Sequence, residues 1–342
     1  MLIYGSMSRN IKENIISILE ANKGLYISGE KLANHLNVSR AAIWKAVKHL
    51  KEEGYDILSV SNRGYALSKE TDILSSKIIK SNMNKYGDKF NFIIYKTVES
   101  TNIIARGLAI NETESGTVVL AEEQTRGYGR DGKSFFSPYG TGIYMSIILN
   151  LKKEKKIFNN SFITTAAATA VSKSIEEISN KETQIKWVND VFINEKKVCG
   201  ILTEGAFSLE DGKLNYAVIG IGINVNFPKD GFPKEIDGIA DSINSKDIED
   251  NNDDEKNKGD IRNILIAKIL ENLYEYYFNN TNFYDEYKKR SFLIGKKISV
   301  TIDGKEHLVK VLDIERSFAL IIEFQDGKID KFVSGNINYR RL

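Results

Sequence analysis

In the first part of the chain, hydrophobic positions follow helical spacing in three successive segments and strand-like spacing in the two segments after them. The expected elements are helices at 11–19, 32–36 and 40–52, followed by strands at 55–60 and 65–67. Ser39 directly precedes the third helix, where its hydroxyl can cap a free backbone N–H group. Three helices followed by a β-hairpin are the pattern of a winged helix-turn-helix domain. We assign residues 1–68 to this domain.

The rest of the chain mixes strands with longer helices. Strands are expected near 90–95, 117–122, 142–150, 185–193, 197–205 and 216–224, and helices near 102–110, 162–179 and 261–280. This pattern predicts a mixed α/β domain over residues 69–290. From residue 291 onward, Asp303-Gly304 and Asp326-Gly327 mark tight turns between short strands, which predicts a small β-barrel over 291–342. The fold class is therefore multidomain α+β.

Composition places few limits on function. The 342 residues suffice for two or three domains, and a net charge of +2 favours no particular partner. Cys199 is the only cysteine, so an internal disulfide is excluded and a reducing cytoplasm is expected. The sequence has no apolar run of 18 residues, so we expect no membrane span. The acidic segment 246–260 is expected to be a surface loop without chemistry of its own.

One face of the third helix carries the features of a DNA-binding surface. Trp44, Lys45 and Lys48 lie opposite the apolar face of that helix, and Arg63 lies on the turn of the hairpin. Residues 1–68 hold nine Lys and Arg against six Asp and Glu. The resulting hypothesis is operator binding through Ser39, Arg40, Trp44, Lys45, Lys48 and Arg63. The alternative is a three-helix packing module with a solvated lysine face, against which the large apolar Trp44 argues.

A glycine-rich segment, 123–133, follows the strand near 117–122. Its three glycines let backbone N–H groups form a concave anion seat, to which Arg130 and Lys133 add positive charge. The letters also fit the dinucleotide fingerprint, but that motif requires a helix to open at its third glycine. Pro138 and two further glycines follow instead, which excludes the dinucleotide interpretation.

Three further motifs accompany this loop. They are Glu99-Ser100-Thr101-Asn102, the run Lys186-Trp187-Val188-Asn189-Asp190 followed by Lys197-Val198-Cys199-Gly200-Ile201-Leu202, and Gly220-Ile221-Gly222-Ile223-Asn224. With all motifs in this order, the sequence resembles the biotin–protein ligase family from about Gly29 to the C-terminus. It is most similar to the bifunctional members that also repress biotin-synthesis genes. Val188 stands where the family commonly has proline, and Phe135 where many members have tryptophan.

The resemblance implies a two-step reaction. Biotin and ATP first form biotinyl-5'-AMP, and biotin is then transferred to a lysine of a biotin carboxyl carrier protein. It also implies a class II synthetase-like central domain and an SH3-like C-terminal barrel. Two alternatives stay open: a lipoate-type protein ligase, and a ligand-sensing regulator without catalysis.

The resemblance also assigns residues to the site. Arg130 and Lys197 are the expected catalytic residues. Expected contacts to biotin are Ser100, Thr101, Asn102, Gln124, Gly127, Tyr128, Gly129, Arg130, Lys197 and Gly200. Expected contacts to ATP and the adenylate are Gly129, Arg130, Gly132, Lys133, Phe135, Lys186, Asn189, Asp190 and Asn224. Asp190 is also the expected carboxylate for Mg²⁺ bound with ATP.

Several of these residues have a simpler explanation. Lys133 also fits a solvated loop lysine, Ser100 and Thr101 a helix N-cap, and Asp190 a turn cap. Gly200 and Gly222 fit either close ligand approach or strand packing. The expected partners are the carrier protein, operator DNA and a second copy of the chain, with biotinyl-AMP as corepressor.

Overall fold

The computed structural model describes residues 2–52, 54–69, 71–152, 160–207, 214–245, 259–302, 304–333, 335 and 337–338. Most of the acidic segment 246–260 therefore lies outside the described residues. The chain forms two compact units. The first comprises Met1–Asn82 and Asp250–Ile264, and the second comprises Met83–Glu249 and Leu265–Leu342.

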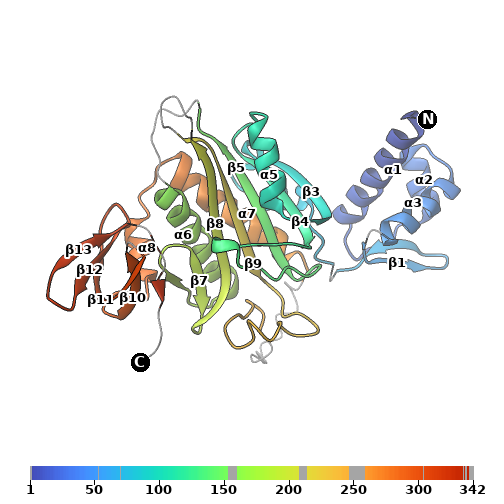
Figure 1. Ribbon diagram of the computed structural model, residues 1–342. Coiled ribbons are helices and arrows are strands. Elements are labelled where there is room, and N and C mark those ends of the chain that lie inside the picture. The colour runs from blue at the N-terminus through green and yellow to red at the C-terminus, as the bar shows by residue number, and fades with distance from the viewer. Residues whose placement is uncertain are drawn as a thin grey trace. The chain divides into compact units, whose positions relative to one another are not determined.

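The first unit contains the predicted three helices and hairpin (Figure 1). Its elements are α1 (Leu2–Ala21), α2 (Gly29–Leu36), α3 (Arg40–Glu52), β1 (Ile57–Val60), β2 (Gly64–Leu67) and α4 (Ser76–Ser81). Helix α2 ends at Asn37, which adopts the left-handed conformation that closes a helix C-terminus. The Ser39 hydroxyl accepts a hydrogen bond from Ala42 N, as predicted for the cap of α3.

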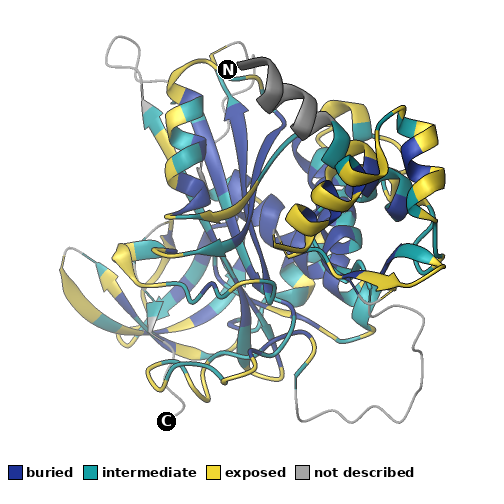
Figure 2. Ribbon diagram, turned by 90° about the vertical axis from the view of Figure 1, so that its right-hand side faces the viewer, coloured by how far each residue is buried: buried dark blue, intermediate teal, exposed yellow. Residues whose placement is uncertain are grey.

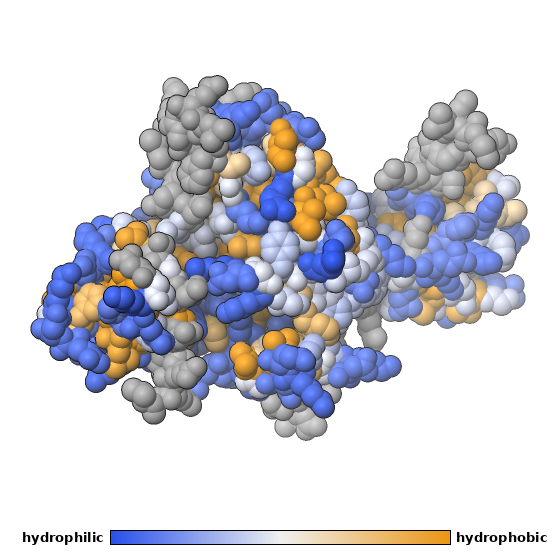
Figure 3. All heavy atoms as spheres, viewed as in Figure 1, coloured by the Kyte–Doolittle hydropathy of each residue, from blue (hydrophilic) through white to orange (hydrophobic). Residues whose placement is uncertain are grey.

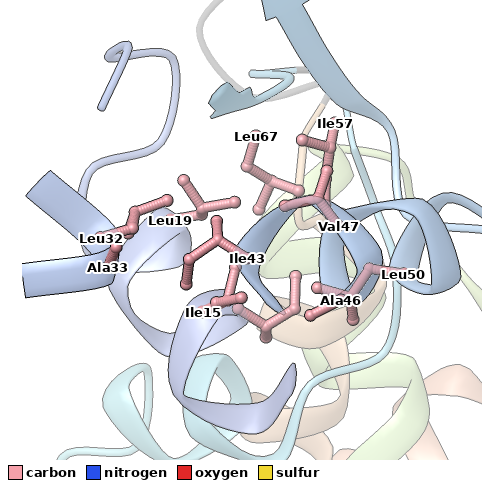
Figure 4. Close-up of a cluster of buried hydrophobic side chains, with 11 residues drawn as sticks. Ile15, Leu19, Leu32, Ala33, Ile43, Ala46, Val47, Leu50, Ile57 and Leu67 are labelled. Carbon is pink, nitrogen blue, oxygen red and sulfur yellow. The ribbon is translucent and has the colours of Figure 1, made fainter. Parts of the chain in front are cut away.

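A continuous apolar core holds these elements together. Figure 4 shows side chains from α1, α2, α3 and the hairpin pointing toward one another. Ile15, Leu19 and Ile43 are completely buried at its centre. Burying such side chains contributes about 1.5–3 kcal/mol each. The helical spacing of these apolar positions therefore fixes which face of α3 remains exposed.

A buried ion pair joins the segment after the hairpin to the start of α7 (Ile261–Leu273) within the first unit. The Arg262 side chain is only 2% exposed, and its Nε donates to Asp72 Oδ2 at 3.0 Å. Arg262 Nη2 also donates to the backbone oxygen of Asp72. Nearby, Lys23 Nζ lies 2.7 Å from Asp260 Oδ2. Charged groups thus secure the connection, whereas apolar side chains form the helical core.

The second unit is built on a seven-stranded sheet of order β3-β4-β5-β9-β8-β7-β6. Its strands are β3 (Asn91–Val98), β4 (Thr117–Gln124), β5 (Gly142–Asn150), β6 (Gln184–Lys186), β7 (Asp190–Ile193), β8 (Lys196–Phe207) and β9 (Leu214–Asn224). Only the β3–β4 pair is parallel among these described strands. The central strands are the most deeply buried (Figure 2), and β5 is buried over nearly its whole length.

Helices pack against this sheet. Helix α5 (Thr101–Ile110) buries Ala105 and Ala109 against β4, β5 and β9. Helix α6 (Asn160–Ser179) packs beside β6, β7, β8 and β9. Helix α7 leads into a π-helical turn (Tyr274–Phe278), and α8 (Tyr284–Arg290) follows. Helices α5, α6 and α7 match the predicted helices, apart from the π-helical end of the segment 261–280, whereas α8 was not predicted.

The single strand predicted at 185–193 is wrong, because residues 187–189 form a turn between β6 and β7. Two side chains hold this turn. The Trp187 indole N–H donates to Phe318 O at 2.7 Å, and Asn189 Nδ2 donates to Ile201 O at 2.9 Å. The Trp187–Val188 peptide bond is cis.

The C-terminal part of the second unit is a five-stranded antiparallel sheet of order β13-β12-β11-β10-β14. Its strands are β10 (Lys297–Ile302), β11 (Lys305–Ile314), β12 (Leu320–Phe324), β13 (Ile329–Phe332) and β14 (Ile337–Asn338). In Figure 3 the visible surface is largely hydrophilic, with smaller apolar groups between. Among the described helices, none combines the length and apolar character needed to cross a bilayer.

Candidate functional site

A cavity of about 550 Å³ lies in the second unit. It brings together the start of α5, the glycine loop after β4, strands β8 and β9, and residues of the C-terminal sheet. Predicted site residues in its lining are Ser100, Thr101, Asn102, Gln124, Tyr128, Gly129, Arg130, Lys133, Phe135, Lys186, Asn189, Asp190, Lys197 and Gly200. Motifs that are far apart in the sequence therefore meet around one space.

One wall of the cavity is a network of short polar side chains. Gln124 Oε1 accepts hydrogen bonds from Thr101 N at 2.8 Å and from Thr101 Oγ1 at 3.1 Å. Ser146 Oγ donates to Thr101 Oγ1 at 2.8 Å and to Asn102 Oδ1 at 2.6 Å. Ser100 occupies the N-cap position of α5, but Gln124 supplies the acceptor for Thr101 N. The wall offers fixed donors and acceptors to a polar ring.

Cations gather at another part of the cavity. Lys197 Nζ lies 2.7 Å from Asp190 Oδ1, and Asn189 Nδ2 donates to the same oxygen at 3.1 Å. Arg130 Nη1 donates to Asn189 Oδ1, and Nη2 to Gly335 O, both at 3.4 Å. Burial lowers the pKa of Lys186, although the nearby Asp190 carboxylate acts in the opposite direction. This group of charges suits a ligand with several negative charges.

Both backbone polar groups of Lys197 are held by one segment, residues 239–241. Its N–H donates to Ile239 O at 2.9 Å, and its carbonyl accepts from Asp241 N at 3.0 Å. A turn is formed at Asn194-Glu195, and Lys197 follows it near the start of β8, with its side chain lining the cavity. Lys196 instead approaches Asp241 Oδ2 at 3.6 Å. The two adjacent lysines therefore have different surroundings.

Three glycines leave room for site side chains on neighbouring strands. A Cβ atom on Gly200 would lie 3.1 Å from Lys197 Nζ, and one on Gly222 would lie 2.7 Å from Phe135 Cε1. A Cβ atom on Gly220 would collide with Asn102 Oδ1. Gly200 and Gly222 are also cross-strand partners. These glycines therefore serve close packing of side chains that line the cavity.

Three predicted residues lie outside the cavity lining formed by the described part of the chain: Gly127, Gly132 and Asn224. Gly127 is buried, and a Cβ there would approach Ser137 Oγ at 2.6 Å. Gly132 has a φ of +70°, which favours glycine at the bend of the loop. Asn224 Nδ2 donates to Asp241 O at 3.0 Å. Each supports a segment that carries lining residues.

Sequence reasoning missed several lining or supporting residues. Ser146 is completely buried in the otherwise apolar strand β5, and this polar position was the available signal. Gly220 lies two positions before Gly222 in β9 and therefore on the same face of the strand, and this spacing was the available signal. Thr301, Gly335 and Ile337 line the cavity from the C-terminal sheet, for which the sequence held no recognisable signal.

The predicted DNA-binding residues form a separate group on the first unit. Arg40, Trp44, Lys45 and Lys48 are exposed on α3, where the Trp44 side chain is 59% exposed. Lys48 Nζ lies 5.9 Å from the centre of the Trp44 ring system. Arg63 is exposed on the hairpin turn, with its guanidinium carbon 4.5 Å from the centre of the Tyr26 ring. The face is thus basic, with an aromatic side chain at its middle.

Comparison with known proteins agrees with both groups of residues. Residues 94–224 match the biotin/lipoate A/B protein ligase family, and residues 12–66 match an HTH domain. The bifunctional ligase/repressor BirA of Bacillus spizizenii is 33% identical over 334 residues, covering 97% of this chain and 99% of that protein. BirA of Escherichia coli is 26% identical over 343 residues, with 96% and 99% covered.

A solved structure supports the fold of the second unit. The biotin protein ligase from Aquifex aeolicus in complex with biotin and ATP is 29% identical to this chain, with a TM-score of 0.57. The match covers 74% of this chain and 99% of the Aquifex chain. Taken with the near full-length similarity to the Bacillus spizizenii protein, it follows that the chain belongs to the family of bifunctional ligase/repressors.

Proposed function

We propose that the protein is an ATP-dependent, AMP-forming biotin–[acetyl-CoA-carboxylase] ligase that also represses biotin-synthesis genes. The observation that carries this function is the cavity in which Lys197, Arg130 and Lys186 lie near the Gln124–Thr101 network. A polar ring with a carboxylate tail and a triphosphate together require this combination of fixed polar groups and cations. A helix-turn-helix domain with a basic exposed face provides the second activity.

In the first step, a carboxylate oxygen of biotin attacks the α-phosphorus of ATP, and the bond to pyrophosphate breaks. Two anions must approach each other, so nearby cations lower the barrier. We assign this role to Lys197 and Arg130, with Lys186 binding phosphate. In the second step, the lysine amine of the carrier protein attacks the carbonyl carbon of biotinyl-AMP, and AMP leaves as the amide forms.

Biotin would bind along the polar wall. Ser100, Thr101, Asn102 and Gln124 are proposed to contact the ureido ring, whose donors and acceptors match their amides and hydroxyls. We propose an indirect role for Gly127, Gly132 and Asn224: they support the segments that carry the lining residues. Phe135, which contacts the edge of Tyr144 at a ring-centroid distance of 6.4 Å, is proposed to stack on adenine.

Mg²⁺ would enter with the phosphates of ATP. Among the described residues, no group of three or more His, Cys, Asp or Glu side chains is arranged to hold a metal ion. Asp190 is the carboxylate nearest the cationic group, and Lys197 already pairs with it. A site of one carboxylate completed by phosphate oxygens and water suits Mg²⁺, which would neutralise phosphate charge when bound.

The finer architecture is also a proposal. We propose a winged helix-turn-helix domain at 1–68, a catalytic domain at 69–290 with a class II synthetase-like fold, and an SH3-like barrel at 291–342. The antiparallel order of the C-terminal sheet supports the last assignment.

Repression would require two copies of the chain. One helix-turn-helix makes few contacts, and a symmetric dimer on a palindromic operator doubles them. We propose that biotinyl-AMP promotes this dimer by ordering the loops near 128–134 and 226–238. Thermodynamic linkage requires two factors to be equal. The adenylate must bind the dimer more tightly than the monomer by the same factor by which it strengthens dimerisation. Sedimentation with a non-hydrolysable adenylate analogue tests this, and an unchanged association constant would remove ligand-driven dimerisation.

The ligase function is tested by incubating the purified chain with ATP, a carrier domain and either biotin or lipoate. We expect ATP-dependent transfer of biotin to the carrier lysine. Preferential transfer of lipoate would support the lipoate-ligase alternative instead. Ligand binding without any transfer would support the ligand-sensing regulator.

A further inference from the structure

Three hydrogen-bond donors converge on the carboxylate of Glu204, a residue of β8 outside the sequence motifs. Tyr128 OH donates to Glu204 Oε2 at 2.9 Å, and Asn102 Nδ2 donates to the same oxygen at 2.7 Å. Arg106 Nη1 lies 3.3 Å from the other oxygen, Oε1. Asn102 and Arg106 lie one turn apart on α5, whereas Tyr128 belongs to the glycine loop. Glu204 therefore connects two separate segments of the cavity.

Both connected segments carry residues of the proposed biotin site. Asn102 accepts from Ser146 and lies directly over Gly220, so its orientation is fixed on three sides. Tyr128 lies between Gly127 and Gly129, and the loop around it closes through Gly129 N donating to Lys133 O at 2.7 Å. A glycine-rich loop has high conformational freedom, so a side-chain attachment in its middle restricts it strongly.

We propose that Glu204 is a positioning residue for biotin: its carboxylate attaches the glycine loop to the first turns of α5 and holds the loop against the cavity before ligand binds. This inference rests on the proposed ligase function. It assigns to Tyr128 the role of a loop attachment. The loop is thereby pre-ordered, and less conformational entropy is lost when biotin binds.

A carboxylate is suited to this position because it accepts hydrogen bonds at both oxygens. The two shorter contacts, from Tyr128 and Asn102, share Oε2, while the partly exposed Arg106 faces Oε1. Glutamine in place of glutamate retains one acceptor oxygen for Tyr128 and Asn102 and presents its amide group to Arg106. Alanine removes the attachment completely.

The test compares Glu204→Ala, Glu204→Gln, Tyr128→Phe and the double variant Glu204→Ala/Tyr128→Phe. Amide hydrogen exchange of residues 127–134 is measured without ligand, and KM for biotin and kcat are measured at saturating ATP. We expect Glu204→Ala to raise loop exchange and the biotin KM about tenfold, because the hydrogen bonds that the Glu204 side chain accepts from Tyr128 and Asn102 are lost. Saturating kcat should change less than about twofold. In Glu204→Gln, loop exchange and the biotin KM should both stay close to the wild-type values.

The double variant should resemble Glu204→Ala alone, since both changes remove the same hydrogen bond. Glu275 offers a matched control, because it accepts from Tyr86 OH at 2.6 Å and from Asn279 Nδ2 at 2.9 Å outside the cavity lining. Glu275→Ala should leave loop exchange and the biotin KM unchanged.

The proposal is overturned if Tyr128→Phe and Glu204→Ala leave loop exchange and the biotin KM at wild-type values, or if their effects add independently. Hydrogen exchange does not depend on turnover. If the wild-type protein failed to transfer biotin, the proposed function would be wrong, while the loop measurement would still decide whether Glu204 holds the loop.

Discussion

Lys197 Nζ and Asp190 Oδ1 lie 2.7 Å apart, and the two residues stand at the beginnings of the adjacent strands β8 and β7. Their side chains are 33% and 22% exposed, so solvent reaches the pair and its strength is moderate. The carboxylate orients the ammonium group over Gly200. An incoming carboxylate or phosphate can therefore share Lys197 without first displacing a deeply buried partner.

Replacing Lys197 tests the proposed catalytic group. We expect Lys197→Ala to lower the rate of biotinyl-AMP formation by about two orders of magnitude or more, because a fixed cation beside the developing charge is lost. Rapid-quench measurement of labelled adenylate gives the rate. Lys196→Ala is the matched control, since the adjacent lysine points toward Asp241. Near-normal adenylate formation in Lys197→Ala would contradict the assignment.

Lys186 should give the site a distinctive response to alkaline pH. Its pKa is lowered mainly by burial, so as pH rises it loses its positive charge before an ordinary lysine does. ATP binding that uses this charge should weaken as pH passes through the lowered pKa. Lys186→Arg keeps its charge to higher pH, so its KM for ATP should rise later in an alkaline titration.

The control for this titration is Lys196→Arg, the same exchange at a lysine that approaches Asp241 and is not among the lining residues of the cavity. Its profile should follow that of the wild type. An identical profile for Lys186→Arg would remove Lys186 from phosphate binding.

The Asp72–Arg262 pair should contribute strongly to the stability of the first unit, because it joins the segment after the hairpin to the start of α7. Asp72→Ala removes the carboxylate that pairs with the Arg262 guanidinium, which is 2% exposed. We expect the free energy of unfolding of the first unit to fall by about 3–5 kcal/mol. Chemical denaturation followed by circular dichroism measures this change.

An exposed pair provides the comparison. Lys288 Nζ lies 2.7 Å from Asp313 Oδ1, with side chains 37% and 46% exposed. Asp313→Ala should therefore cost about 0–1 kcal/mol. Equal losses in the two variants would show that burial does not determine the contribution of the Asp72–Arg262 pair.

The salt dependence of operator affinity should distinguish charged from apolar contacts made by α3. Lys48→Ala should reduce the slope of log affinity against log salt by about 0.9, as expected for one lost phosphate contact. Trp44→Ala should weaken binding with an unchanged slope, because the lost side chain is uncharged. Fluorescence anisotropy across a salt series gives both values. Lys152→Ala, in the second unit, should match the wild type, and an unchanged or steeper slope for Lys48→Ala would refute the proposed face.

Local pattern predicted most of the fold, because helical and strand-like spacing follows directly from which faces are buried. The failure at 185–193 had a distant cause, since Trp187 hydrogen-bonds to Phe318 more than a hundred positions away in the chain. Charged members of the site, such as Lys197 and Asp190, stood in recognisable motifs. Ser146 and Glu204 did not, because their roles arise only when β5, β8 and the glycine loop come together.

The glycines at positions 200, 220 and 222 make the site vulnerable to changes that alter no charge and no hydrogen-bonding group. At Gly220 and Gly222 the Asn102 and Phe135 side chains occupy the space that a methyl group would take, and at Gly200 a methyl group would lie 3.1 Å from Lys197 Nζ. A single added carbon would therefore displace a functional group while leaving its chemistry intact. In a screen for inactive variants, alanine at position 220 or 222 would resemble the loss of the partner side chain itself.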